Sequence, residues 1–197
     1  MKVDHLLRIR QAAAIIANKR GLAGLSMNGL AESLGVGSPS LYVHVKGIAE
    51  VERLLGLDGF AALSERVMSA TVGKSGPEAV RALLTALRDF IRESPGFYDA
   101  TLLIAPADDL EWNKAAKRLG EIYLAVFQTY NLDRVNAIHA LRGLLSVAHG
   151  FSYLEHRWQT QGVDPDETFA WLVDSYVAAI EHVAAYFEPT SNTAGQQ

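Results

Sequence analysis

The sequence contains no cysteine among its 197 residues, which excludes disulfide scaffolds, thiolate metal sites, iron–sulfur clusters and cysteine nucleophiles. No apolar run approaches the roughly 18 residues of a membrane-spanning helix, and the first residues lack the apolar stretch of a secretory signal. Hydrophobic residues make up 49% of the chain and charged residues 20%, as in folded globular proteins. We therefore expect a cytoplasmic protein with one large domain or two small ones.

The net charge is small, but it is unevenly divided. The formal net charge is −4, yet residues 1–53 carry seven Lys/Arg against four Asp/Glu. The remaining residues carry 11 basic and 18 acidic side chains. A basic N-terminal segment on an acidic body indicates a polyanion partner for that segment, although a fluctuation of a few charges gives the same balance.

Runs of alternating apolar residues are also missing, and helical periodicity dominates the chain, so the sequence predicts an all-α fold. Gly35 and its neighbours separate two short predicted helices, and Ser26 is placed to cap the first of them. Ser38-Pro39 is typical of a cap followed by proline at the first position of the second helix, over about residues 39–45. The apolar residues that should hold these helices together are Leu30, Ala31, Leu34, Leu41 and Val45. This arrangement is the minimum for a helix-turn-helix.

Hydrogen-bond donors remain on the exposed side of the second short helix. Small residues at its start would let the backbone lie deep in the major groove of DNA, and the donors would reach phosphate oxygens. The exposed residues are Ser38, Ser40, Tyr42, Val43, His44 and Lys46. Taken singly, Tyr42 is also compatible with a packing tyrosine and Lys46 with a solvated helix-end cation.

The stretch from Leu34 to Lys46 resembles the helix-turn-helix of the tetracycline-repressor (TetR) family, and its Leu-Tyr-x-His-Val-Lys form is closest to the tetracycline repressor subgroup. Other positions at the family's spacing are Ala12-Ala13, Gly21, Ser26, Leu30-Ala31, Leu41-Tyr42 and His44. The resemblance implies that Ser26 touches a phosphate and that Tyr42, His44 and Lys46 bind phosphates. It implies that Ser38, Pro39 and Ser40 lie nearest the bases. Val43 is also expected to bind DNA, and changes at Ser40 and Val43 are expected to alter sequence preference.

The sequence departs from the family pattern at Ile48, where many members have a lysine. One phosphate contact is therefore expected to be missing or moved. Arg53 lies too far along the next helix to replace it, whereas Arg10, Lys19 and Arg20 are candidates for contacts to the flanking DNA backbone.

A second stretch, Leu141–Glu155 followed by Asp164–Phe169, resembles the C-terminal domain of the His-Gly-containing (WHG-type) TetR subgroup, without the tryptophan that often precedes the His-Gly pair. The family resemblance implies an apolar or aromatic small-molecule effector bound among the middle helices. It also implies a homodimer through the helices predicted near residues 133–158 and 166–187, acting on a palindromic operator. The effector-binding candidates are Phe90, Trp112, Tyr123, Phe127, His149 and Tyr153. For any one of these aromatics, ordinary core packing is the competing interpretation.

The expected organisation is a DNA-binding domain over residues 1–46, a linking helix over 47–72, an effector-binding and dimerisation domain over 73–188 and a disordered tail over 189–197. No catalytic motif, metal-ligand set or cofactor loop is recognisable, and His139, His149 and His156 lack a carboxylate or thiolate partner nearby. The sequence therefore predicts a DNA-binding repressor without enzymatic activity. Two alternatives stay open: a helical ligand carrier whose head no longer binds DNA, and an enzyme with His149 as its base.

Overall fold

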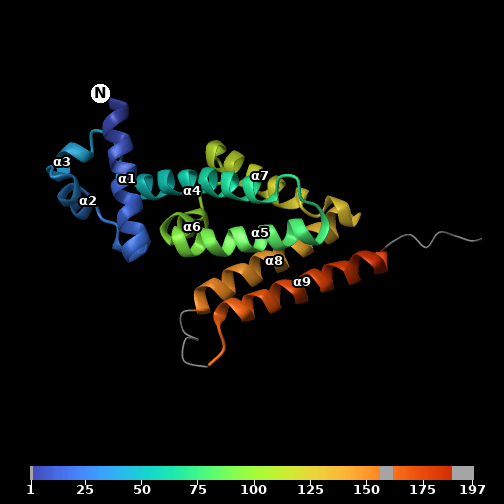
Figure 1. Cartoon of the computed structure of the whole chain (residues 1–197). Helices are drawn as coiled ribbons and strands as arrows, with labels where there is room; N and C mark the ends of the chain where they lie inside the picture. Colours follow the sequence, from blue (N-terminus) through green and yellow to red (C-terminus); the bar gives the residue numbers. More distant parts are fainter. Residues whose placement is uncertain (1, 156–161, 188–197) are drawn as a thin grey trace, which may run out of the picture. The chain divides into compact units, whose positions relative to one another are not determined.

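The computed structural model describes residues 2–155 and 162–187, and every regular element in that part is helical (Figure 1), which confirms the all-α prediction. The elements in chain order are α1 (Lys2–Arg20), η1 (Leu22–Gly24), α2 (Met27–Leu34), α3 (Ser38–Leu41), α4 (Ile48–Thr71), α5 (Gly76–Glu93), α6 (Pro95–Thr101), α7 (Leu110–Ala125), η2 (Gln128–Tyr130), α8 (Arg134–Leu154) and α9 (Pro165–Phe187). No helix in the described ranges is long and apolar enough to cross a membrane.

Two predicted helices are shorter than expected. Helix α3 ends at Leu41, and the Leu41 carbonyl oxygen accepts hydrogen bonds from the His44 N–H at 2.9 Å, in a tighter turn, and from the Val45 N–H at 3.0 Å. Its capping residue is Gly37 rather than the predicted Ser38, which already lies in the first helical turn. The sequence predicts one long helix over about residues 108–130 with acids in its first turn, but the structure divides it into α7 and η2. A left-handed Asn131 with φ 50° ends the second piece.

The chain forms two compact units, residues 1–69 with 86–122 and residues 70–85 with 123–197. The domain bounds expected from the sequence stay predictions. The predicted tail over residues 189–197 lies outside the described residues.

The first unit contains the helix-turn-helix region, which we call the head (residues 1–46), together with α6 and most of α4 and α7. The buried apolar cluster of this region is Ile9, Ala13, Ala17, Leu25, Leu30, Ala31, Leu41, Val45, Val51, Leu55 and Ala100. Of the residues predicted to hold the head together, Leu34 is half-buried against this cluster and the others are buried. The head core is thus completed by residues of α4 and α6.

Close approaches between α1, α4 and α6 depend on glycines. A Cβ atom at Gly96 in α6 would lie 2.5 Å from the carbonyl carbon of Ala17 in α1. The Gly96 N–H also donates to Oδ1 of Asn18 at 2.8 Å. A Cβ atom at Gly59 in α4 would lie 2.5 Å from the carbonyl oxygen of Phe97 in α6. Through these glycines the backbone of α6 packs directly against that of α1 and against that of α4.

The second unit is built around α8 and α9, which lie side by side (Figure 1). The rings of Phe151 and Phe169 are 5.2 Å apart, and the Tyr176 hydroxyl donates to the carbonyl oxygen of Ala140. Burial raises the pKa of Tyr176 to about 12, so the hydroxyl keeps its proton at neutral pH. The buried stripe of α9 consists of Phe169, Val173, Val177 and Ile180.

Candidate nucleic-acid interface

Local backbone chemistry fixes the turn between α2 and α3. The Ser26 hydroxyl accepts a hydrogen bond from the Gly29 N–H at 3.1 Å, which confirms the predicted cap. Gly35 has φ 66°, and the Val36 N–H donates to the Ala31 carbonyl oxygen at 3.0 Å, as in a Schellman motif. Gly35 therefore supplies the left-handed conformation that the turn requires.

Two serines at the start of α3 make hydrogen bonds that sequence reasoning missed. The Ser38 hydroxyl donates to Oδ1 of Asn28 on α2 at 2.8 Å, and the Ser40 hydroxyl donates to the Gly37 carbonyl oxygen at 2.7 Å. Asn28 thereby orients the first turn of α3 and holds its own side-chain amide at the exposed end of the head. The only available signal was its place two residues after the capping serine.

Every residue predicted to contact DNA lies at the surface. Tyr42 is 56% exposed and Val43 is 70% exposed, so neither is a packing residue of the head. His44 is half-buried, and its ring stacks on that of His5 with the centroids 5.2 Å apart. The remaining members are Ser26, Ser38, Pro39, Ser40 and Lys46. We call these eight residues the recognition surface.

Two arginines near the head form ion pairs instead of facing open solvent. Arg10 binds both carboxylate oxygens of Asp58 on α4, with its Nε 2.7 Å from Oδ2. Arg53 binds Asp109 through Nη2 at 2.7 Å, and the same nitrogen lies 2.9 Å from the Glu111 carboxylate. Arg10 is therefore a poor candidate for the flanking DNA contact proposed from the sequence. Arg53 does not replace the lysine that is missing at Ile48.

The predicted acidic N-terminus of α7 is confirmed. Oδ1 of Asp109 accepts from the Trp112 N–H at 3.1 Å, so Asp109 caps the helix while it binds Arg53. The Arg53 guanidinium and then this backbone N–H lower the pKa of Asp109 from 3.8 to about 2.

Replacement of Asp109 by asparagine should destabilise the protein at neutral pH, because asparagine keeps the cap but removes the charge that binds Arg53. The folded protein holds Asp109 ionised at lower pH than the unfolded chain does, so this stabilisation is present above about pH 4 and is lost as the pH falls towards 2. Urea unfolding of wild type and Asp109→Asn between pH 7 and pH 2 measures it, with Asp108→Asn as the control. A difference that stayed constant to pH 2 would contradict this assignment.

The effector candidates are divided between the two units. Phe90 and Trp112 belong to the first, and the Trp112 ring packs edge-on against Phe60 at 5.0 Å. The candidates in the second unit are Tyr123, Phe127, His149 and Tyr153.

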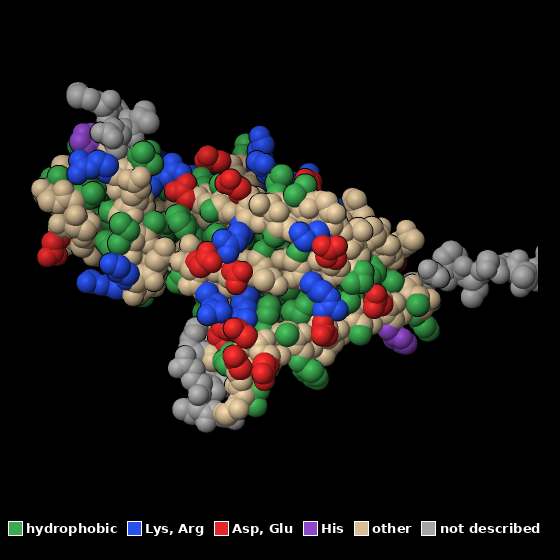
Figure 2. Space-filling model, viewed as in Figure 1, with side chains coloured by type: hydrophobic (Ala, Val, Ile, Leu, Met, Phe, Trp, Pro, Cys, Tyr) green, Lys and Arg blue, Asp and Glu red, His purple; other side chains and the backbone are tan. Residues whose placement is uncertain are grey.

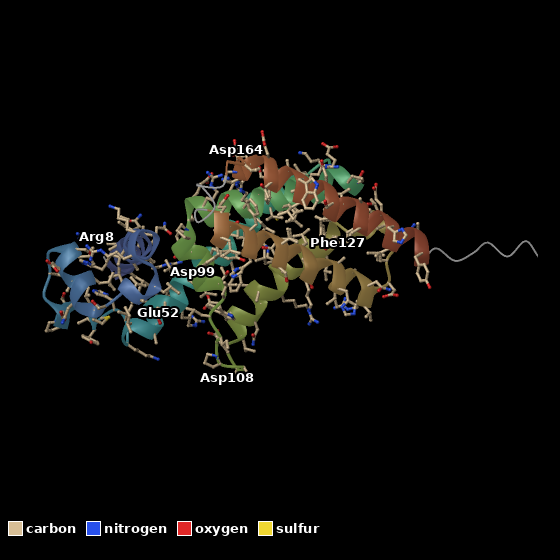
Figure 3. The ribbon with its side chains drawn as sticks, turned by 90° about the horizontal axis from the view of Figure 1, so that it is seen from below. Arg8, Glu52, Asp99, Asp108, Phe127 and Asp164 are labelled. Carbon is tan, nitrogen blue, oxygen red and sulfur yellow. The ribbon has the colours of Figure 1, made fainter. Side chains whose placement is uncertain are left out.

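Within the second unit, Phe127 is 1% exposed and lies among the helices (Figure 3). The His149 and Tyr153 rings stack at 4.5 Å. No atom of a described residue lies within 4 Å of a Cβ built on Gly150, the residue beside His149. Among the described side chains no cluster of His, Asp and Glu could hold a metal ion, and His156 lies outside them.

Comparison with known proteins identifies the chain. Residues 80–176 match the family described as tetracyclin repressor-like, C-terminal domain. The HTH-type transcriptional regulator YobS of Bacillus subtilis is 33% identical over 146 residues, which span 74% of this chain and 76% of the relative. The chain belongs to the TetR family. It is therefore a DNA-binding transcriptional regulator, and its helix-turn-helix is the element that this function requires.

Further relatives agree with the TetR assignment. The HTH-type regulator Rv0681 of Mycobacterium tuberculosis is 28% identical over 174 residues, 88% of this chain and 80% of the relative. The structure of a TetR variant from Acinetobacter baumannii AYE in complex with minocycline has the same fold, with a TM-score of 0.67 and 18% identity. That likeness covers 89% of this TetR-family chain and 96% of the other.

Proposed function

We propose that this TetR-family regulator is a repressor that binds a palindromic operator as a homodimer and leaves it when a small apolar or aromatic molecule binds. The observation that carries the proposal is the recognition surface. Its exposed tyrosine and lysine follow two short helices, the first capped by Ser26 and joined to the second by a turn at Gly35. The eight residues of that surface are proposed to contact DNA, with Ser38, Pro39, Ser40 and Val43 nearest the bases and the others on phosphates.

Dimerisation is supported by the outer face of α9. A stripe at helical spacing runs along the side away from the buried stripe and carries no Lys, Arg, Asp or Glu. Its members are Trp171, Ser175, Ala178, His182 and Tyr186. Trp171 is 66% exposed, an unusual environment for a tryptophan in a monomer and a common one for a residue of an interface. We infer that α8 and α9 pair with their symmetry mates in a four-helix interface.

Replacement of Trp171 by arginine should convert the dimer to a monomer, because it removes a large apolar contact and places two like charges near a twofold axis. Multi-angle light scattering at micromolar concentration should give about twice 21.4 kDa for the wild type and 21.4 kDa for the variant. Ile104→Arg changes a 99% exposed residue in the first unit and should leave the mass dimeric. A wild-type mass of one subunit would contradict the dimer.

The operator is tested by selection of genomic DNA at two salt concentrations, followed by sequencing. Two heads related by a twofold axis lie about 34 Å apart on DNA, so the recovered sites should be rough palindromes with that spacing. Their affinity should fall steeply with salt. Recovery of nothing above background at low salt, also with refolded, ligand-free protein, would favour the second candidate function, a ligand carrier whose head no longer binds DNA. Ile48 and the net charge of −4 favour that candidate.

Release by an effector is proposed as a population shift. Two conformers are compared, one whose heads fit DNA and one whose heads do not. The effector must bind the second conformer more tightly than the first, because equal affinity for both leaves their populations unchanged. We propose that its contacts in the second unit are Tyr123, Phe127, His149 and Tyr153. We also propose that the C-terminal domain belongs to the His-Gly-containing subgroup. Screening an apolar and aromatic library for loss of DNA binding tests this. A library without one active compound would overturn the effector step and leave DNA binding intact.

A further inference from the structure

A groove of about 320 Å³ opens in the head between α1 and the segment that follows α3. Its floor includes the buried side chains of Ile9 and Leu41, and Val43 of the recognition surface forms part of its wall. Four polar side chains line it as well: His5 and Arg8 from α1, and Ser40 and His44 from the recognition surface. The groove therefore adjoins the residues already proposed to contact DNA. One side of it is formed by α1, which is not part of the helix-turn-helix.

Among the residues whose side chains the structure describes, the charge that lines the groove has one sign. The titratable and charged members are His5, Arg8 and His44, and none of the described lining residues is Asp or Glu. The stacked rings of His5 and His44 bring two imidazoles from different elements within 5.2 Å of each other. An apolar floor beneath two imidazoles and a guanidinium complements a sugar–phosphate chain, which has apolar sugar edges and an anionic phosphate.

Arg8 differs from its neighbour Arg10 on the same helix. Arg10 is held by Asp58. The exposed Arg8, which Figure 3 labels in the head, forms no ion pair with a described side chain. In Figure 2 the histidine colour lies next to the Lys/Arg colour on the head. A guanidinium without a described acidic partner, beside a groove whose described lining contains no acid, is available to an external anion.

We propose that this groove is a second phosphate-binding site of the DNA interface, in which the backbone next to the recognition surface accepts hydrogen bonds from Arg8 and His5. The inference rests on the DNA-binding function of the head. It assigns to α1 a contact that compensates for the lysine missing at Ile48. The groove then helps to set the register of the head on DNA without selecting a base.

Arg8→Gln tests the site, with affinity for an operator-containing duplex and for an unrelated duplex measured by fluorescence anisotropy at several salt concentrations. We expect about a tenfold loss of affinity on both duplexes, because charge-assisted hydrogen bonds to phosphate are strong. The slope of log affinity against log salt should fall by about 0.9, the value of one phosphate contact. Arg118→Gln removes the same charge from an exposed position on α7 and should change neither quantity.

The outcomes separate this site from the function of the head. A wild type that binds no DNA overturns the proposed function itself. A wild type that binds, with an Arg8→Gln variant of unchanged affinity and salt slope, overturns only the groove. Equal thermal melting of the two proteins shows that a loss of affinity is not a loss of folding. Displacement of DNA by a small apolar carboxylate that binds in the groove, with the salt slope of DNA binding unchanged, would also overturn the phosphate assignment.

His5 is tested by His5→Gln in the same assay. The variant should lose affinity for both duplexes alike, and by less than Arg8→Gln, because glutamine removes the imidazole but keeps a hydrogen-bond donor. Wild-type affinity of His5→Gln for both duplexes would remove His5 from the site.

Discussion

Alanine at Tyr42 should lower DNA affinity about 30-fold, on operator and unrelated DNA alike. The Tyr42 hydroxyl is proposed to donate to a phosphate, and hydrogen bonds to charged groups contribute roughly 1.5–3 kcal/mol. The side chain is 56% exposed, so its loss removes few intramolecular contacts. Tyr42→Phe separates the hydroxyl from the ring and should account for about a tenfold part of the loss. Fluorescence anisotropy with two duplexes at one salt concentration measures all of these values.

Lys46→Ala is the companion to this test, because the ammonium is a point charge that contributes chiefly through counterion release. It should reduce the slope of log affinity against log salt by about 0.9, whereas Tyr42→Phe should leave the slope unchanged. A Tyr42→Ala protein that lost affinity for the operator but kept its affinity for unrelated DNA would contradict the phosphate role and move Tyr42 to base recognition.

The head shows which features can be predicted from the sequence. Ser26 and Gly35 act through hydrogen bonds and backbone conformations within a few residues, so their roles follow from local rules. The bounds of α3 do not, because Ser38 is held by Asn28 across the turn and the chain tightens at Leu41. A pattern of apolar residues specifies that two helices pack, but not where the last turn ends.

Charged residues show the opposite limit. In the sequence, Arg10 and Arg53 cannot be distinguished from arginines that bind phosphate. Their carboxylate partners, Asp58 and Asp109, lie 48 and 56 residues away along the chain. Only the packing of α1 and α7 on α4 brings these pairs together. The groove beside Arg8 is unpredictable for the same reason, since its walls come from both sides of the helix-turn-helix.

Gly59 lies in the first unit at a position that should not tolerate a methyl group. A Cβ atom there would lie 2.5 Å from the carbonyl oxygen of Phe97 and 2.9 Å from Cγ2 of Thr101. The first of these atoms belongs to the backbone of α6, so the contact cannot be relieved by rotation of a side chain. Either α4 and α6 separate or their backbones distort, and overpacking of this kind costs about 3 kcal/mol.

Gly59→Ala should therefore lower the melting temperature by roughly 6–12 °C, the shift that such a free energy produces in a chain of this size. Gly120→Ala is the matched control, because Gly120 also lies inside a helix but nothing described is within 4 Å of a Cβ there. That variant should be more stable than wild type by about 0.5–1 kcal/mol, the difference in helix propensity between the two residues. Thermal melts at equal protein concentration compare the three proteins, since dimerisation makes the melting temperature concentration-dependent.

Because α6 also meets α1 at Gly96, loosening the α4–α6 contact should weaken the support of the head. Gly59→Ala should therefore lose DNA affinity even below its melting temperature. A Gly59→Ala protein with wild-type melting would show that α4 and α6 do not pack at this distance in solution.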